Sequence, residues 1–410
     1  MTATSDGQAT RAKAARPDNG RSRDTFRDFA YTGPGTLAGR YLRGFWQPVY
    51  RARDLPAGHA KPIRVMSEDF TLYRGEEGTP HLVAFRCAHR GTQLSTGWVE
   101  GDCIRCFYHG WKYDGSGQCV EQPAEDAGFA SKVKIESYPC EEYLGLIFAY
   151  LGEGAERGDT GAFRPPLPRY PRWESTSRQL DIITYTRDCN FMNNIENNLD
   201  EAHLPFVHRT SRMHVEWQDV PRITCEPSPW GATVRASRPG GREHIYQFGM
   251  PNLLYTLIAI GVVQNADGAA VHSHMLSWRV PIDDERHVSF NAMLTEVAGD
   301  QVPAFRAAMR RRGEVLASLP SPESLAAAVM RGELKTTDLP TDRPDLPNIQ
   351  DYIAQVGQGA IRDVDHERLG TSDRGVILMR QLWARELRAF AEGKPLTPWR
   401  YSDDLPATVE

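Results

Sequence analysis

The sequence predicts an α+β protein of two domains: an all-β domain, then a larger domain with an antiparallel sheet and helices. Three observations support this. The chain has 410 residues, about twice the usual length of one domain. Short apolar segments separated by glycine and acidic residues fill the first third, a pattern typical of a small β-sandwich or barrel. The second half joins longer strand-like segments to alanine- and arginine-rich helical ones.

The first 24 residues contain almost no large apolar side chains. Basic residues there are typical of a transit peptide, but aspartates are interspersed and no apolar segment follows, which argues against a secretory signal. We expect 1–24 to be a disordered tail. We expect the first domain to span 40–160 and the second to span 161–405, with 25–39 packed against the second.

Composition excludes several classes of partner. The formal net charge of −5 predicts no attraction to nucleic acid or to an anionic membrane, and no apolar run approaches the roughly 20 residues that span a bilayer. The seven cysteines are an odd number in a chain without a signal sequence, which indicates a reducing compartment. We therefore expect a cytoplasmic protein.

Elements follow from apolar periodicity and from turn residues. Four prolines between 151 and 180 indicate a linker. A polar stretch at 189–209 is compatible with a helix, and Pro320-Ser321-Pro322 separates two further helices. We expect strands at 63–66, 70–73, 81–85, 145–150, 232–237, 253–264, 271–280 and 287–297, and helices within 302–333 and at 374–392.

Two short loops of the first domain each offer one thiolate and one imidazole. The first contains Cys87 and His89, the second Cys106 and His109. The pairs suit a [2Fe–2S] cluster in which two cysteines hold one iron and two histidines hold the other. Tetrahedral zinc is the competing site, but the single residue inside C-x-H is shorter than the usual zinc-ligand spacing. The nearby Cys103 and Cys119 lie off the pattern, and we expect buried thiols.

A second group, Asp200, His203 and His208, lies in the polar helical stretch. Two imidazoles and one carboxylate form the iron site of non-haem Fe(II) oxygenases, which leaves positions open for oxygen. On an ideal helix His203 and His208 would point about 140° apart. We expect Pro205, between them, to break the helix and bring the imidazoles together.

Together these motifs resemble the α subunits of Rieske non-haem iron oxygenases, the aromatic-ring-hydroxylating dioxygenase family, over about residues 40 to 400. The phthalate-dioxygenase-like branch is the most similar. Its markers here are Asn190-Phe191-Met192, Glu196-Asn197, the run 358–363, and the run 369–373 with Val376 and Arg380.

The resemblance implies roles for individual residues. Cys87, Cys106, His89 and His109 would hold the Rieske cluster. His203, His208 and Asp373 would bind a mononuclear Fe(II), with Asp363 or Asp365 as alternatives to Asp373. Asp200 would bridge electron transfer from a neighbouring subunit's cluster, and Asn197 would lie near the iron. The implied fold is a helix grip, in which a curved antiparallel sheet surrounds the long C-terminal helix, and the implied assembly is a head-to-tail homotrimer or larger.

The resemblance also implies an activity. The chain would be a terminal oxygenase that uses O2 to hydroxylate or dihydroxylate a small aromatic or heterocyclic substrate. N- or O-demethylation is an alternative, and an electron-transfer protein without oxygenase activity is an alternative of another class. No G-x-G-x-x-G motif follows a strand, so an NAD(P)H-dependent reductase with flavin and iron–sulfur centres would supply electrons, directly or through a ferredoxin. Residues 253–263 and 275–280 are candidate substrate walls, with 300–345 as a lid.

Overall fold

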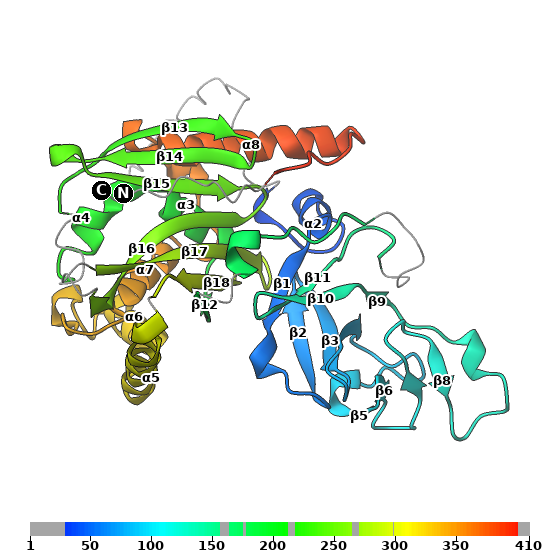
Figure 1. Cartoon of the computed structure of the whole chain (residues 1–410). Coiled ribbons are helices and arrows are strands. Elements are labelled where there is room, and N and C mark those ends of the chain that lie inside the picture. The colour runs from blue at the N-terminus through cyan, green and yellow to red at the C-terminus, as the bar shows by residue number, and fades with distance from the viewer. Residues whose placement is uncertain are drawn as a thin grey trace, which may run out of the picture.

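The computed structural model describes residues 29–155, 164–174, 178–211, 218–264, 270–297 and 299–400. Figure 1 shows an all-β region, blue to cyan, beside a larger region that holds a long sheet and most of the helices. The predicted tail, 1–24, lies outside the described residues. The described part of 25–39 lies against the larger region, because the Phe29 ring is 6.0 Å from Trp383 in the last helix.

Three antiparallel sheets build the first region, with strand orders β1-β11-β10, β2-β3-β4-β9 and β5-β6-β7-β8. Alternating apolar side chains such as Phe70 and Leu72 are fully buried. A small separate core surrounds Cys87 and Cys106. The strands are β1 (Gln47–Arg51), β2 (Ala60–Val65), β3 (Glu68–Arg74), β4 (Pro80–Ala84), β5 (Trp98–Glu100), β6 (Cys103–Arg105), β7 (Lys112–Tyr113), β8 (Cys119–Glu121), β9 (Ser137–Tyr138), β10 (Cys140–Tyr143) and β11 (Leu146–Ala149).

The larger region is built on one seven-stranded antiparallel sheet of order β12-β18-β17-β16-β15-β14-β13. Successive strands from β13 to β18 pair as a meander, and β12 completes the edge beside β18. Short connections between neighbours make this antiparallel order possible. The strands are β12 (Gln179–Arg187), β13 (Arg222–Ser228), β14 (Gly231–Ser237), β15 (Glu243–Gly249), β16 (Leu253–Gln264), β17 (Ala270–Pro281) and β18 (His287–Thr295).

The last helix, α8 (Arg374–Ala391), packs along β13 and β14 and against α2 (Leu37–Arg43) and α3 (Phe191–Leu199). Val376, Met379, Leu382, Trp383 and Leu387 repeat at three- and four-residue spacing, so they form one buried face. Trp383 is fully buried, and its indole donates to the Pro251 carbonyl at 3.1 Å. The predicted helix 374–392 and the sheet packed against it are confirmed.

Three further helices follow β18: α5 (Val302–Ser318), α6 (Pro322–Met330) and α7 (Leu346–Val356). Helix α5 contacts β16, and α7 packs against α3 and α6. The break predicted at Pro320-Ser321-Pro322 is present, and the Ser321 hydroxyl caps α6. Helix α7 and the strands β12, β13 and β15 were not predicted. β12 begins inside the range that we had assigned to the linker, since its β-branched residues from 182 to 186 continue the sheet. No described helix is long and apolar enough to cross a membrane.

The buried His274 on β17 makes stability depend on pH. Its Nε2 accepts from Arg172 at 2.8 Å, and its Nδ1 lies 2.7 Å from the Tyr255 hydroxyl. Burial, together with the nearby Arg172 charge, lowers the pKa of His274 from 6.5 to about 4. The unfolded chain therefore binds a proton that the folded chain does not between these two values, and stability is lost as pH falls from 6.5 through 4.

We expect His274→Gln to flatten this part of the pH profile by up to about 3 kcal/mol in the free energy of unfolding. Denaturant unfolding at pH 7, 5.5 and 4.5 measures the difference between variant and wild type, so any effect of metal loss common to both cancels. His366→Gln is the matched control because this side chain is 85% exposed. Equal slopes for the His274 variant and wild type would contradict the prediction.

Two candidate metal sites

The two Cys/His loops lie at one end of the first region. Cys87 and His89 follow β4, and Cys106 and His109 connect β6 to β7. Each loop closes with a backbone hydrogen bond to its cysteine carbonyl, from Gly91 at 3.0 Å and from Gly110 at 3.1 Å. Both glycines have φ near +75°, a conformation that other residues rarely adopt. The two loops therefore make the same turn and present their side chains to each other.

Like ligands lie together in this site. Burial and the neighbouring Cys106 thiol raise the pKa of Cys87, and the rings of His89 and His109 are 4.4 Å apart. Cys87 and Cys106 are buried, and the His89 ring stacks on Trp111 at 4.5 Å. The Nδ1 atom of His89 is buried and has no hydrogen-bond partner in the described part of the chain. An orphaned ring nitrogen at this position is what a metal ligand would leave when no metal is present.

This arrangement does not favour the zinc alternative. Four ligands of one tetrahedral zinc converge to within roughly 4 Å of each other, given metal–ligand bonds of about 2.0 to 2.3 Å. Among the described residues, no three of these four side chains bring their ligand atoms within 4.8 Å of one another. The pairing of sulfur with sulfur and nitrogen with nitrogen instead fits a two-iron cluster. Of the off-pattern thiols, Cys119 is buried and Cys103 is half-buried.

The second candidate site begins where helix α3 ends. Asp200 has an extended backbone (φ −106°, ψ 92°), and its carboxylate accepts from the Ala202 amide at 2.9 Å. A short 3₁₀ turn, η5 (Glu201–His203), follows, and then α4 (Leu204–Val207) with Pro205 in its first turn. The prediction that Pro205 breaks the helix is wrong. The break lies at Asp200, whose side chain caps the new turn, and Pro205 is tolerated because the first turn needs no amide donor from it.

His203, His208 and Asp351 converge. Their ligand atoms all lie within 4.8 Å of one another, and the structure describes no other such group of histidine, cysteine and acidic residues. Asp351 Oδ1 lies 3.4 Å from His208 Nε2 and 3.7 Å from His203 Nε2. This buried oxygen makes no well-formed hydrogen bond with a described residue. Burial raises the pKa of Asp351, but His208 and His203 more than offset this and lower it to about 2. A carboxylate that is ionised at neutral pH is what a metal ligand requires.

The other ring nitrogen of each histidine is bonded to the protein. His203 Nδ1 donates to the Asp200 carbonyl, and His208 Nδ1 donates to the Gln350 side-chain oxygen at 3.0 Å. These bonds fix the tautomers, so both Nε2 atoms face Asp351 with a lone pair. The donor set of two imidazoles and one carboxylate suits a mononuclear iron.

We predicted Asp373 as the third ligand, but the structure places Asp351, and not Asp373, beside His203 and His208. Asp373 precedes α8, and its carboxylate accepts from the Gly370 amide, so it stabilises the turn that begins this helix. The fallback residues are also elsewhere, because Asp363 bonds His366 at 2.7 Å and Asp365 lies in the same exposed turn. Asp351 was missed because α7 was missed. Buried Leu346, Ile349 and Tyr352 at three-residue spacing were the available signal.

Asn197 and Asp200 lie beside the group. Asn197 Nδ2 is 3.4 Å from His203 Nε2, and its oxygen accepts from Gln355 at 2.8 Å. One carboxylate oxygen of Asp200 is 3.8 Å from His203 Nδ1. Both residues are thus positioned to act on His203 without being part of the converging set.

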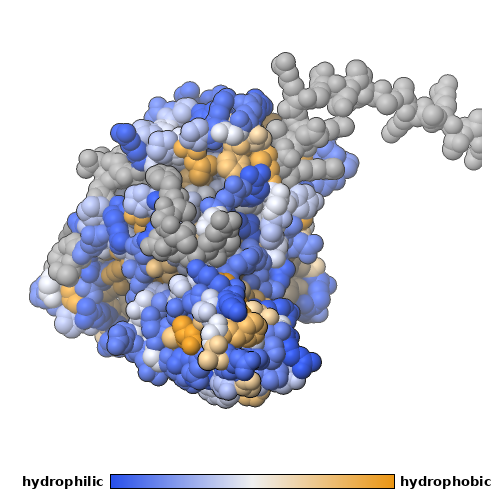
Figure 2. Space-filling model, turned by 90° about the vertical axis from the view of Figure 1, so that its right-hand side faces the viewer, coloured by the Kyte–Doolittle hydropathy of each residue, from blue (hydrophilic) through white to orange (hydrophobic). Residues whose placement is uncertain are grey.

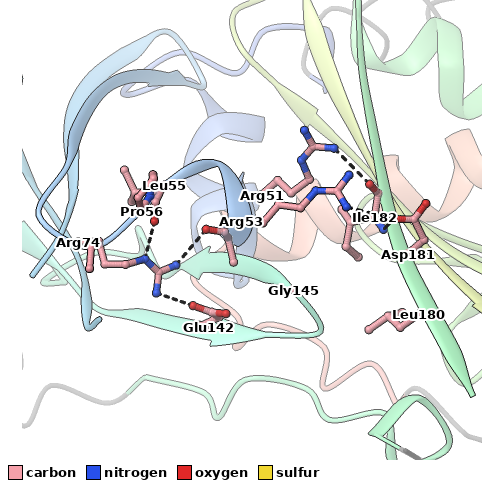
Figure 3. A pocket seen from close by; sticks show the side chains of 12 residues that line it. Arg51, Arg53, Leu55, Pro56, Arg74, Glu142, Gly145, Leu180, Asp181 and Ile182 are labelled. Carbon is pink, nitrogen blue, oxygen red and sulfur yellow. Dashed lines mark hydrogen bonds and ion pairs between the residues drawn. The ribbon is translucent and has the colours of Figure 1, made fainter. Parts of the chain in front are cut away.

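A large cavity, about 1320 Å³, opens from this group. Its lining includes His203, His208, Asp351 and apolar side chains of β16 to β18 and α5, so the predicted walls and the predicted lid both contribute. The cavity extends to the junction between the two regions, where Figure 3 shows Arg51 and Arg53 facing β12. There Arg51 donates to the Ile182 carbonyl at 3.4 Å. A cavity of this size accommodates a small organic molecule.

Comparisons with known proteins agree with this geometry. The Rieske [2Fe-2S] domain model matches residues 45–139, which include both Cys/His loops. These residues lie inside the predicted range 40–160, whose two boundaries stay a prediction.

Similar proteins extend over most of the chain. The oxygenase subunit of 5,5'-dehydrodivanillate O-demethylase from Sphingobium sp. is 31% identical over 89% of this chain and 80% of that protein. The α subunit of phenoxybenzoate dioxygenase from Ectopseudomonas oleovorans is 29% identical over 88% of this chain and 84% of that protein. Among solved structures, Pseudomonas putida CBB5 NdmA with caffeine bound, a QL mutant, has a TM-score of 0.62 at 19% identity and covers 90% of this chain and 97% of that one. At 19% identity, the likeness to this structure shows the fold alone.

The Tyr113 hydroxyl offers a test of the first site. It lies 3.2 Å from Cys87 Sγ and accepts from the Ala88 amide at 3.3 Å. If Cys87 holds the cluster as a thiolate, which has no proton to donate, the Tyr113 hydroxyl is the donor of this bond. We expect Tyr113→Phe to lower the reduction potential by about 40 to 60 mV, the equivalent of about 1 to 1.4 kcal/mol for one electron. The measurement is a redox titration followed by EPR. Tyr73→Phe removes another hydroxyl from the same small core without touching sulfur, and should leave the potential unchanged.

The correction from Asp373 to Asp351 can be tested by metal analysis. We expect Asp351→Ala to lose about one iron per chain while the cluster spectrum is retained, since it removes the only carboxylate of the proposed donor set. Asp373→Ala should keep the full iron content and cost about 1 kcal/mol of stability, the usual value of one lost hydrogen bond. Iron loss from the Asp373 variant, with retention in the Asp351 variant, would restore the original assignment.

Proposed function

This chain belongs to the Rieske non-haem iron oxygenases, and on that basis we propose that it hydroxylates or dihydroxylates a small aromatic or heterocyclic substrate within the cavity beside Asp351. It is an oxygenase α subunit, an oxidoreductase that incorporates O2 with a Rieske cluster and a mononuclear iron as cofactors. The observation that carries the proposal is the second metal group, His203, His208 and Asp351, at the wall of that cavity.

We assign the metal ligands as follows. Cys87 and Cys106 would hold one iron of the cluster, and His89 and His109 the other. His203, His208 and Asp351 would hold the mononuclear iron, which in such a three-ligand site keeps positions open for oxygen. Other residues of the chain orient these ligands: the Asp200 carbonyl and the Gln350 side chain accept hydrogen bonds from the two imidazoles and fix their directions.

Asp200 is our candidate for the link between the two kinds of centre. Its carboxylate and its carbonyl both approach the Nδ1 atom of His203. This is the side of the imidazole away from Asp351, which lies near Nε2. We propose that a neighbouring subunit places the histidines of its cluster against this face. Asn197, which lies on the other side of the imidazole, would hold His203 in place.

A head-to-tail homotrimer would supply this neighbour. Beside the cluster loops, Trp98, Phe107 and Tyr108 are each more than half exposed, and Trp98 packs on Phe107 at 5.4 Å. Figure 2 views the molecule from this end and shows apolar groups among a mainly hydrophilic surface. Exposed aromatic groups next to a redox centre favour a protein partner at this face. That partner would be a second copy of the chain, and a reductase with flavin and iron–sulfur centres, or a ferredoxin, would reduce the cluster.

Two alternatives lead to different products. O-demethylation is favoured by the relative named an O-demethylase, which matches most of the chain. An electron carrier without oxygenase activity would need neither the cavity nor the group at Asp351.

A cytoplasmic location is supported by the seven cysteines, all of which are free of disulfide bonds.

The function is tested by a single turnover. Reduced wild-type protein, loaded with iron and mixed with O2 and aromatic acids or aryl methyl ethers, should oxidise its cluster and form a hydroxylated or demethylated product. Asp200→Asn should keep both metals yet slow cluster oxidation by at least 100-fold, because it removes the charge next to His203. Cluster oxidation at the wild-type rate with full iron occupancy would remove Asp200 from the path. If no compound in a broad panel produces oxygen uptake in the wild-type protein, the electron-carrier alternative is favoured.

A further inference from the structure

The cavity wall contains two arginines that have no side-chain oxygen as partner among the described residues. Seven arginines line the cavity. Five of them contact a carboxylate or side-chain amide oxygen of a described residue. The other two, Arg310 and Arg312, both lie on α5, and only Arg312 is partly buried. The five partnered arginines are Arg51, Arg53, Arg178, Arg279 and Arg306.

Among the described residues, Arg312 makes a single hydrogen bond, and its partner is neutral. One of its guanidinium nitrogens donates to the Pro344 carbonyl at 3.3 Å, which leaves most of its five donors unused. The nearby acid, Asp345, is already bonded twice to Arg343, at 2.5 and 3.1 Å. None of the described residues places a carboxylate within ion-pairing distance of Arg312.

The charge of this partly buried arginine is not neutralised by a carboxylate of any described residue. Burial lowers the pKa of Arg312, since it penalises the charged form, and Asp345 and Asp181 oppose this only in part. Protein interiors normally pair such charges. The group that completes the pair in this wall would come from the cavity itself, where an anion could accept two parallel N–H bonds.

The position of Arg312 relates it to the metal group. Pro344 immediately precedes the cap of α7, and Asp351 lies on the second turn of that helix. The rise from Leu346 to Asp351 is roughly 8 Å. Ile258, Met275, Met293 and Phe305 line the same cavity and offer apolar surface suited to an aromatic ring. A ring that bears an anionic group would thus lie between Arg312 and the metal group.

We propose that Arg312 binds a carboxylate of the substrate, which makes this enzyme selective for aromatic carboxylic acids and directs the remainder of the ring toward His203, His208 and Asp351. The inference rests on the proposed oxygenase function and adds the substrate's anionic group and the residue that recognises it. Arginine is suited to this role because its planar fork matches the two oxygens of a carboxylate.

The experiment compares acids with their neutral amides on the full-length, iron-loaded protein. The probes are benzoate, 4-methoxybenzoate and 3-phenoxybenzoate, each paired with its benzamide. Calorimetry measures binding, and oxygen uptake with product analysis measures kcat/KM. We expect wild type to bind at least one acid on the order of 10- to 100-fold more tightly than its amide, the range of a charge-assisted bond. Arg312→Gln should remove this preference and change amide binding less than about threefold. Arg312→Lys should restore part of it.

Arg311→Gln is the matched control, since this neighbouring arginine is exposed and does not line the cavity. Its acid-to-amide ratio should equal that of wild type. The inference is overturned if wild type prefers none of the acids, or if Arg312→Gln keeps the preference. An Arg312-dependent preference in binding, without oxygen uptake for any compound, supports the carboxylate site and contradicts the oxygenase function. Oxygen uptake with amides as readily as with acids supports the oxygenase function and contradicts the carboxylate site.

Discussion

Hydrogen bonds between α3 and α7 help to hold the Asp351 carboxylate opposite the two imidazoles, which lie in the turns that follow α3. Asn193 donates to the Gln355 carbonyl at 3.1 Å, and the Gln355 side chain donates to Asn197 at 2.8 Å. Asp351 lies one helical turn before Gln355 and on the same face of α7. Because buried amides that lose their partner cost about 1 to 3 kcal/mol each, these bonds resist any sliding of one helix along the other. The metal group is therefore a consequence of how two helices are joined.

A buried ion pair network holds α3 from its other side. Glu196 is almost fully buried and contacts Arg362 at 2.5 Å and Arg380 at 2.7 Å. Burial raises the pKa of Glu196, but the two guanidinium groups outweigh it and lower the pKa overall. Loss of either arginine would leave an uncompensated buried charge, which costs about 3 to 5 kcal/mol. The network joins α3 to α8 and to the segment that follows α7, so several of the residues that mark the family in the sequence prove to be the ones that fix α3.

The sequence was most informative where the structure is local. Both Cys/His loops could be predicted because each pair of ligands lies within a few residues and each loop ends in a glycine of fixed backbone role. His203 and His208 were also proposed from the sequence, because two imidazoles with a carboxylate are the donor set of a non-haem iron site. Asp351 was not predicted. It lies far from the two histidines in the sequence and comes close to them only because α3 and α7 pack together. The helix break was assigned to Pro205 although the Asp200 side chain makes it, since a capping carboxylate and a proline give similar patterns in a polar stretch.

The sequence spans of the two sites have a consequence for biosynthesis. The four cluster ligands lie within 23 residues, whereas the mononuclear group needs Asp351, which is 242 residues beyond His109. At a ribosomal rate of about 5 to 20 residues per second, Asp351 is synthesised roughly 12 to 48 seconds after the last cluster ligand. During that interval all four cluster ligands are present while the second site does not yet exist. The ligands of the single iron are therefore complete only when the chain is nearly finished, whereas the cluster ligands are complete 242 residues earlier.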